Sequence, residues 1–227
     1  MHSKLKNLFI NSDAVKNVVE EKNMEIVRVR NGMFATNTYL IGDSNGCYVI
    51  DPSDDYIRIK RAIDERFSSK IKSILLTHGH LDHVGSVDKL VNDYLCKVYL
   101  SDNDKFYIDG SLTKYPNNLQ EFNIKINSST IDAYLINDSN IIVYETPGHT
   151  PGSVCYLFKE EKVIFVGDTL FKGSVGRTDL TGGSTKELIK SLKILKNLPD
   201  DLRVCCGHEG ETTLGQEKKF NPYLTRI

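Results

Sequence analysis

Short apolar runs rich in β-branched residues alternate along the chain with longer stretches whose apolar residues recur every three or four positions. The short runs predict β-strands, and the longer stretches predict amphipathic helices. The predicted strands are Glu25–Val29, Thr38–Ile41, Cys47–Ile50, Lys72–Leu76, Lys97–Leu100, Ile141–Glu145, Val154–Phe158, Val163–Val166 and Arg203–Cys205. The predicted helices are Tyr56–Phe67, Val87–Tyr94, Thr185–Leu195 and Leu214–Phe220. The fold class we expect from this alternation is α/β.

The chain is expected to form one domain at residues 24–227. Nothing in this range marks a linker, and 227 residues with 40% hydrophobic content suffice for one sizeable core. Residues 1–23 show no catalytic signal, and we expect them to be an extension that packs on this core. Residues 101–140 are polar and rich in Asn, Asp and Ser, so we expect a loop or small helices there that shape an entrance.

Charge and cysteine content narrow the class of protein. The 29 basic and 30 acidic residues are spread evenly and leave a net charge of -1, which argues against a protein that neutralises nucleic-acid phosphates. No apolar run approaches the ~18 residues of a membrane span, and the N-terminus lacks the apolar segment of a signal peptide. The five cysteines show no CxxC spacing, which indicates reduced thiols. We therefore expect a cytoplasmic protein with a small-molecule partner and neither nucleic acid nor membrane; a homodimer is left open.

The polar residues that could carry chemistry lie just past the ends of predicted strands. The run Thr77-His78-Gly79-His80-Leu81-Asp82-His83 follows one strand and packs three imidazoles and a carboxylate into six positions. His149, Asp168 and His208 follow three later strands. Imidazole nitrogen and carboxylate oxygen are the ligands that zinc, iron and manganese accept. Because loops after separate strands converge at one edge of an α/β sheet, we expect a metal site there.

The number of candidate ligands indicates two metal ions rather than one. His78, His80 and His149 can face one ion, and Asp168 has two oxygens and is the natural bridge. The second ion would take the remaining three, Asp82, His83 and His208. Two ions on the order of 3.5–4 Å apart can hold a water between them and lower its pKa toward ~7. We expect zinc, with iron or manganese as alternatives, and we assign catalytic roles to Asp82 and Asp168.

Other polar residues leave alternatives open. Asp51 follows a predicted strand and could orient a histidine N–H or form an ordinary turn. Lys172 and Arg177 lie in the glycine-rich segment after Asp168 and could bind a substrate anion. Asp179 could orient a ligand or pair with Arg177, and an ordinary surface ion pair is an equal alternative for this segment.

Four of these motifs resemble the metallo-β-lactamase superfamily. They are the Thr77–His83 run, the segment Thr146-Pro147-Gly148-His149-Thr150-Pro151-Gly152-Ser153, Gly167-Asp168 and Gly207-His208. Within that superfamily, Gly176-Arg177-Thr178-Asp179-Leu180 and the ending Thr212-Thr213-Leu214-Gly215 to Asn221-Pro222-Tyr223-Leu224 are similar to small single-domain glyoxalase II-like hydrolases. The resemblance runs from about Met24 to Leu224.

The resemblance implies a four-layer αββα sandwich with metals at one edge of its two sheets. It implies that a metal-bound hydroxide attacks an ester or thioester carbonyl, for example in S-lactoylglutathione or another small acyl-thiol. Two departures bear on the substrate. Glyoxalase II enzymes carry a C-terminal helical domain that helps to bind glutathione, and this chain ends soon after His208. The sequence after Gly207 reads His-Glu-Gly-Glu, where relatives commonly have His-Gly-Pro.

Other activities on the same scaffold remain alternatives. A persulfide dioxygenase-like oxidoreductase would use one iron and is similar around Gly176–Asp179. A lactonase or phosphodiesterase on the same scaffold is a third possibility. The complete second ligand set favours hydrolysis, because a mononuclear enzyme does not need it.

Overall fold

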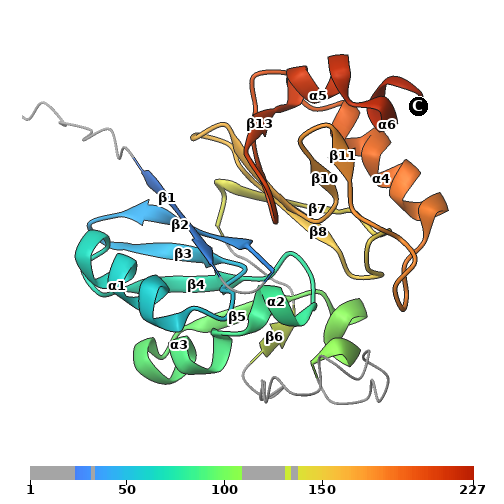
Figure 1. The fold of residues 1–227 in the computed structure, drawn as a ribbon. Coiled ribbons are helices and arrows are strands. Elements are labelled where there is room, and N and C mark those ends of the chain that lie inside the picture. The colour runs from blue at the N-terminus through green and yellow to red at the C-terminus, as the bar shows by residue number, and fades with distance from the viewer. Residues whose placement is uncertain (1–23, 32–33, 109–130, 134–137) are drawn as a thin grey trace, which may run out of the picture.

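The computed structural model describes residues 24–31, 34–108, 131–133 and 138–227. Residues 1–23, with the expected packing extension, lie outside this description. The first sheet has the order β1-β2-β3-β4-β5-β6, and the second has the order β13-β12-β9-β8-β7 (Figure 1). The first contains β1 (Glu25–Asn31), β2 (Thr36–Asp43), β3 (Gly46–Ile50), β4 (Ile71–Leu75), β5 (Lys97–Leu100) and β6 (Ile131–Ala133). The second contains β7 (Ile141–Glu145), β8 (Val154–Phe158), β9 (Val163–Gly167), β12 (Arg203–Cys206) and β13 (Thr212–Thr213).

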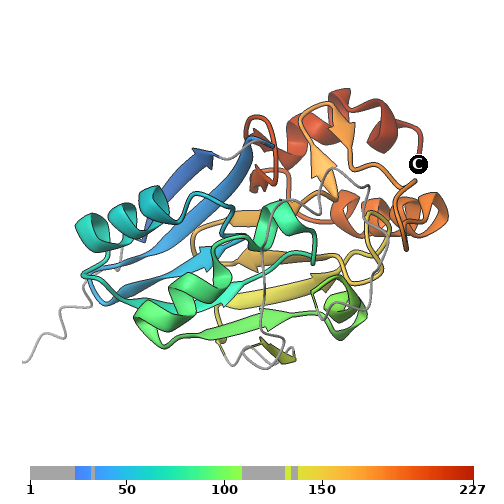
Figure 2. The ribbon, with the colours of Figure 1, turned by 60° about the horizontal axis from the view of Figure 1, so that its bottom comes forward.

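Helices cover the outer face of each sheet, so the molecule has the four αββα layers that the resemblance implied (Figures 1 and 2). The first sheet carries α1 (Tyr56–Arg66) and α3 (Val87–Tyr94), with the single turn α2 (Leu81–Val84) at its edge. The second carries α4 (Thr185–Lys196), α5 (Leu214–Phe220) and α6 (Pro222–Thr225). A small hairpin of β10 (Leu170–Phe171) and β11 (Ser174–Val175) and the 3₁₀ helix η1 (Asp102–Tyr107) complete the described elements.

Strand alternation builds three apolar layers. In β8, Cys155 and Leu157 join the cluster under α4, whereas Tyr156 and Phe158 join the cluster between the sheets. Every residue of β8 is therefore buried, which explains why the sequence shows a continuous apolar run rather than an alternating one. Aromatic rings join the two sheets across this middle layer, as Tyr39 of β2 and Phe165 of β9 do with ring centroids 5.3 Å apart.

The nine strands and four helices predicted from the sequence are all present, with ends that differ by at most two residues. The elements that were not predicted have two to four residues, as in β10, β11, β13 and α6, except for η1, which has six. Such lengths carry too little periodicity to read. In the polar stretch 101–140 the described residues contain η1 and β6.

Strand direction brings several loops to one edge. β3 runs parallel to β4, β9 runs parallel to β12, and β7 has the direction of β9 because both are antiparallel to β8. Several hydrogen bonds fasten the two sheets at this edge. Among them are those from Val154 N to Thr77 O at 2.9 Å, from Asn37 N to Gly207 O at 2.7 Å and from Tyr156 Oη to Leu76 O at 2.8 Å.

The cysteines are free thiols, and all except Cys96 are buried. Cys205 points into the layer between the sheets, and Cys206 points to the opposite face. Burial raises the pKa of both Cys47 and Cys155 to about 12, so these thiols stay protonated and unreactive at neutral pH. Within the described residues, no helix combines the length and the apolar character needed to cross a bilayer.

Candidate metal centre

The seven candidate ligands converge at the shared edge of the two sheets. Six of them form two trios, and the ligand atoms of each trio lie within 4.8 Å of one another. The first trio is His78, His80 and His149, and the second trio is Asp82, His83 and His208. These are the two sets that the sequence analysis predicted.

Asp168 lies between the two trios. Its Oδ2 is 3.5 Å from His149 Nε2 of the first trio and 3.4 Å from His208 Nε2 of the second. Its Oδ1 is 3.5 Å from His83 Nε2. The carboxylate therefore faces both trios at once, as a bridging ligand must.

The donor atoms fit a divalent metal. Metal–ligand bonds of ~2.0–2.1 Å at tetrahedral angles place two ligand atoms ~3.3 Å apart. His149 Nε2 and His80 Nδ1 are 3.0 Å apart, and His83 Nε2 and His208 Nε2 are 3.4 Å apart. His78 Nε2 and Asp168 Oδ1 are buried and have no hydrogen-bond partner among the described residues. A buried polar atom without a partner is costly, and a bound ion would satisfy both atoms.

Backbone carbonyls and one carboxylate orient three of the imidazoles. His149 Nδ1 donates to Arg177 O at 2.7 Å, and His208 Nδ1 donates to Phe34 O at 3.1 Å. His83 Nδ1 lies 3.0 Å from Asp51 Oδ2. In each ring the other nitrogen then faces the centre, which is the usual arrangement of metal-binding histidines.

Asp51 has contacts that favour orientation over ligation. Its Oδ1 accepts from Thr77 N at 2.7 Å, and its Oδ2 accepts from Thr77 Oγ1 at 2.6 Å in addition to His83 Nδ1. Asp51, His78 and His83 form a third group of residues that could hold a metal ion. Both oxygens of Asp51, however, already accept hydrogen bonds from Thr77 and His83. The residue has a φ of 49°, which turns the chain sharply after β3.

Glycine is required where the loops meet. A Cβ on Gly207 would lie 2.2 Å from Asp168 Oδ1 and 2.8 Å from His83 Cε1. A Cβ on Gly148, where φ is 150°, would lie 2.4 Å from the Leu188 backbone. Both glycines therefore let the His208 and His149 loops approach the centre closely.

The two trios differ in protonation. Burial and the nearby His149 lower the pKa of His80 to about 3, and burial holds the pKa of His78 well below its usual value. Burial also lowers the pKa of His83, but the nearby carboxylates, led by Asp82, outweigh it and raise the pKa to about 9.

In the same way Asp168 and Asp82 outweigh burial and raise the pKa of His208 to about 10. In return the pKa values of Asp82 and Asp168 are lowered. Burial opposes this change, but His83 and His208 outweigh it. Without metal, His78 and His80 of the first trio are therefore neutral, whereas His83 and His208 of the second trio hold protons.

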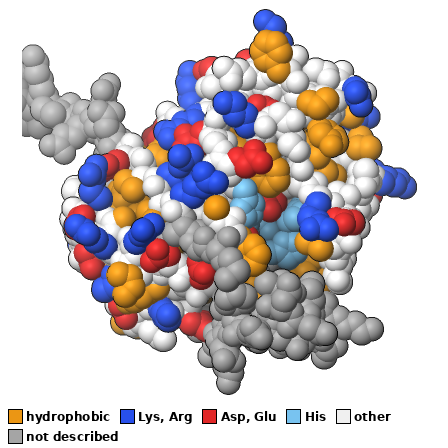
Figure 3. Space-filling model, in the orientation of Figure 1, with side chains coloured by type: hydrophobic (Ala, Val, Ile, Leu, Met, Phe, Trp, Pro, Cys, Tyr) orange, Lys and Arg blue, Asp and Glu red, His pale blue; other side chains and the backbone are white. Residues whose placement is uncertain are grey.

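The residues considered for substrate binding lie beside the centre. The exposed Arg177 guanidinium makes two hydrogen bonds of 2.7 Å to Asp179, and the Arg177 backbone carbonyl holds His149. Asp179 thus pairs with Arg177 rather than with a histidine. Lys172 is exposed in the turn of the β10–β11 hairpin. Figure 3 shows the histidine side chains at the surface between the two halves, among charged and hydrophobic side chains.

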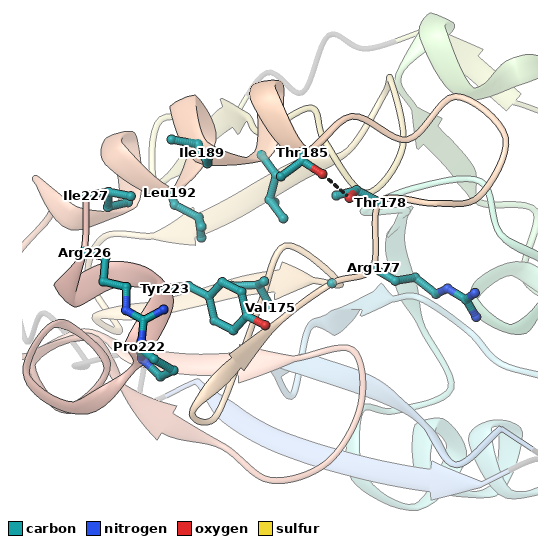
Figure 4. Close-up of a pocket in the computed structure, with 12 residues that line it drawn as sticks. Val175, Arg177, Thr178, Thr185, Ile189, Leu192, Pro222, Tyr223, Arg226 and Ile227 are labelled. Atoms are coloured by element: carbon teal, nitrogen blue, oxygen red, sulfur yellow. Dashed lines mark hydrogen bonds between the residues drawn. The ribbon is translucent and has the colours of Figure 1, made fainter.

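A cavity of about 850 Å³ lies behind the centre, between α4, α6 and the segment Val175–Thr178 (Figure 4). Gly176 forms the wall between the cavity and the centre, because a Cβ on Gly176 would lie 3.3 Å from His149 Cβ. The Arg177 side chain points away from the residues of α4 and α6 that line the cavity. The cavity is therefore separate from the face on which the seven ligands converge.

Among the contacts of the centre that were not predicted from the sequence, two are made by the side chains of Thr36 and Asp104. Thr36 Oγ1 donates to Asp82 Oδ2 at 2.9 Å, and the buried Asp104 hydrogen-bonds the loops that carry His80 and His149. Thr36 precedes the predicted strand at Thr38, and Asp104 lies in the polar stretch left without an assignment. Neither position carries a local signal, because the contact depends on segments distant along the chain.

Comparison with known proteins gives a consistent result. The family model described as "Metallo-beta-lactamase superfamily" matches residues 31–208. "Hydroxyacylglutathione hydrolase GloC" of Haemophilus influenzae is 36% identical over 218 residues, which cover 89% of this chain and 98% of that protein.

Two solved structures align with most of the chain. "TTHA1623 in a di-iron-bound form" has 35% identity and a TM-score of 0.75, over 87% of this chain and 100% of that one. "ETHE1 from Myxococcus xanthus" has 26% identity and a TM-score of 0.67, over 88% of this chain and 84% of that one.

Proposed function

Because the chain belongs to the metallo-beta-lactamase superfamily, we propose that it is a metal-dependent hydrolase of the glyoxalase II type that cleaves a small acyl-thioester. The observation that carries this proposal is the position of Asp168, whose two oxygens lie within 3.5 Å of histidines from both trios. A centre that uses one ion has no need of the second trio. The likeness to "Hydroxyacylglutathione hydrolase GloC" supports the thioester substrate.

In this proposal some residues hold the metal ions and others orient the imidazoles. The first and second trios would each hold one divalent ion, for which we propose zinc, with iron or manganese as alternatives. Bound there, the ions would make water a nucleophile at neutral pH and polarise the scissile carbonyl. Asp51 and the carbonyls of Arg177 and Phe34 keep three imidazoles turned toward the centre.

The carboxylates of Asp82 and Asp168 are the catalytic acceptors in this proposal. Because their pKa values are lowered, both stay ionised at neutral pH and can accept a hydrogen bond from the attacking water. A thioester releases a thiolate, which is a good leaving group and needs little help from a general acid. The site therefore does not require a separate proton donor.

The test is release of thiol from S-D-lactoylglutathione by protein reconstituted separately with zinc, iron or manganese. We expect release with at least one metal and its loss in Asp168→Ala. Asp201→Ala is the control, because Asp201 is an exposed carboxylate that pairs with Lys162. The absence of release with every metal would refute this substrate and would favour lactone or phosphodiester substrates.

The resemblance around Gly176–Asp179 supports a second candidate, a persulfide dioxygenase-like oxidoreductase that uses one iron. This candidate requires activity without the second trio. We expect His208→Ala protein loaded with iron to lose thioester hydrolysis. If it instead consumes oxygen with glutathione persulfide at the rate of the parent protein, the oxygenase assignment replaces the hydrolase.

A further inference from the structure

Asp104 is a buried carboxylate outside the predicted ligand set. It lies in η1 and has no exposed surface. Its Oδ2 accepts from Gly79 N at 2.9 Å and Thr150 Oγ1 at 2.7 Å, and its Oδ1 accepts from Gly152 N at 2.6 Å. A carboxylate without such donors would be expensive to bury, so these three donors account for its place in the interior.

The three donors belong to the two loops of the first trio. Gly79 lies between His78 and His80, and Thr150 follows His149 directly. One side chain thus ties together two loops that lie about 70 positions apart in the sequence. Asp104 lies close to both loops. A Cβ on Gly152 would lie 2.7 Å from Asp104 Oδ1, and a Cβ on Gly79 would lie 2.9 Å from Asp104 O.

A second contact from η1 acts on the same trio. The Tyr107 ring packs against His80 at a centroid distance of 4.8 Å and an interplanar angle of 77°. The Tyr107 hydroxyl donates to Thr181 O, in the loop that follows Asp179. This 3₁₀ helix therefore fixes the ring of one ligand and, through Asp104, the backbone of two loops.

The second trio is positioned by different groups. His83 is oriented by Asp51, His208 by the Phe34 carbonyl and Asp82 by Thr36. Among the described residues, none of these contacts involves Asp104. The two positions of the centre thus have mostly different supports, although Asp51 also holds Thr77, next to His78.

We infer that Asp104 is a positioning residue for the first trio alone: it sets the distance between the His78–His80 loop and the His149 loop, and with it the metal affinity of that position. The inference rests on the proposed metal site. Asp104 does not touch the metal, since its oxygens are occupied by the two loops. Removing such a support typically costs about 10- to 100-fold in metal affinity.

The test uses two full-length variants, each of which keeps only one of the two metal positions. His208→Ala retains the first trio, and His80→Ala retains the second. Zinc affinity is measured by competition with a chelating dye, with and without Asp104→Asn. We expect Asp104→Asn to weaken zinc about 10- to 100-fold in the His208→Ala protein and to leave the His80→Ala protein unchanged. In metal-free protein, the Gly79 and Gly152 amides should exchange with solvent faster in Asp104→Asn.

Glu217→Gln is the matched control. Glu217 is also buried and accepts from Gly173 N at 2.8 Å and Thr212 Oγ1 at 2.7 Å, but it contacts neither trio. We expect Glu217→Gln to lower the melting temperature without changing zinc affinity at either position.

Two outcomes would overturn the inference while leaving the metal site intact. In the first, Asp104→Asn has no effect on zinc affinity. In the second, it weakens both positions alike, which would reveal a general loss of structure. If the parent protein binds no zinc, iron or manganese, the proposed metal site itself fails and the inference fails with it.

Discussion

Zinc uptake by the second trio should release more protons than uptake by the first trio. The difference follows from the pKa values of the metal-free centre. A metal can bind only a deprotonated imidazole nitrogen. His83 and His208 have pKa values raised to about 9 and about 10, whereas the pKa of His80 is lowered to about 3.

The number of protons can be worked out from these values. At pH 7.5 a group with a pKa of about 9 is about 97% protonated. Because the Nε2 atoms of His83 and His208 are 3.4 Å apart, the two rings titrate together. The pair should therefore release at least one proton and at most two. Each proton released makes the apparent affinity rise about tenfold per pH unit, so the affinity of the second trio should rise about 10- to 100-fold between pH 7 and pH 8.

Calorimetry of zinc binding in two buffers with different heats of ionisation measures the protons released. The His80→Ala protein, which keeps the second trio, should release one to two protons at pH 7.5. The His208→Ala protein, which keeps the first trio, should release fewer, because the pKa values of His78 and His80 are lowered. Equal release from both proteins, or affinities that do not change between pH 7 and pH 8, would refute the assignment of protons to the second trio.

Three further predictions concern the support of the centre. Gly207→Ala should lower the free energy of unfolding by about 1–3 kcal/mol and abolish thiol release, because its Cβ would lie 2.2 Å from Asp168 Oδ1. Gly210→Ala is the control, because a Cβ at Gly210 meets nothing within 4 Å. It should behave as the parent protein in thermal melts and in the thiol assay. Asp51→Asn should weaken zinc at the second trio about 10- to 100-fold in dye competition, because the amide is a poorer acceptor for His83 Nδ1; unchanged affinity would contradict an orienting role. The melting temperature of metal-free protein should fall as the pH rises from about 6.5 toward about 9, because the unfolded chain loses the proton that the folded His83 retains; a flat profile would contradict the raised pKa.

The sequence was sufficient for the fold because the buried strands have strong local signals. β8 and β9 are continuous apolar runs, since each lies between two apolar layers. The candidate ligands could be singled out for a related reason, because each follows such a strand or lies in the run His78–His83. Because strand direction places these loops at one edge of the sheets, their convergence could be predicted from the sequence without knowing the distances between the side chains.

The supports of the centre could not be predicted in the same way. Asp104 is one of several acidic residues in a polar stretch, and only its hydrogen bonds with the Gly79 and Gly152 amides distinguish it from the others. For Arg177 the sequence left two interpretations open, and the structure shows its guanidinium paired with Asp179. The part of Arg177 that contacts His149 is its backbone carbonyl, and a carbonyl contact does not depend on which side chain the position carries.

The hydrogen bonds that fasten the two sheets at their shared edge also bear on the order in which the molecule assembles. His83 and His208 lie 125 positions apart, and they meet only where the sheet of the first half of the chain docks on the sheet of the second half. Closing so long a loop is a late and slow event compared with the pairing of neighbouring strands. Separation of the sheets at this edge would therefore abolish the centre while most secondary structure remained. During gradual denaturation, activity should disappear before the helical circular dichroism signal does.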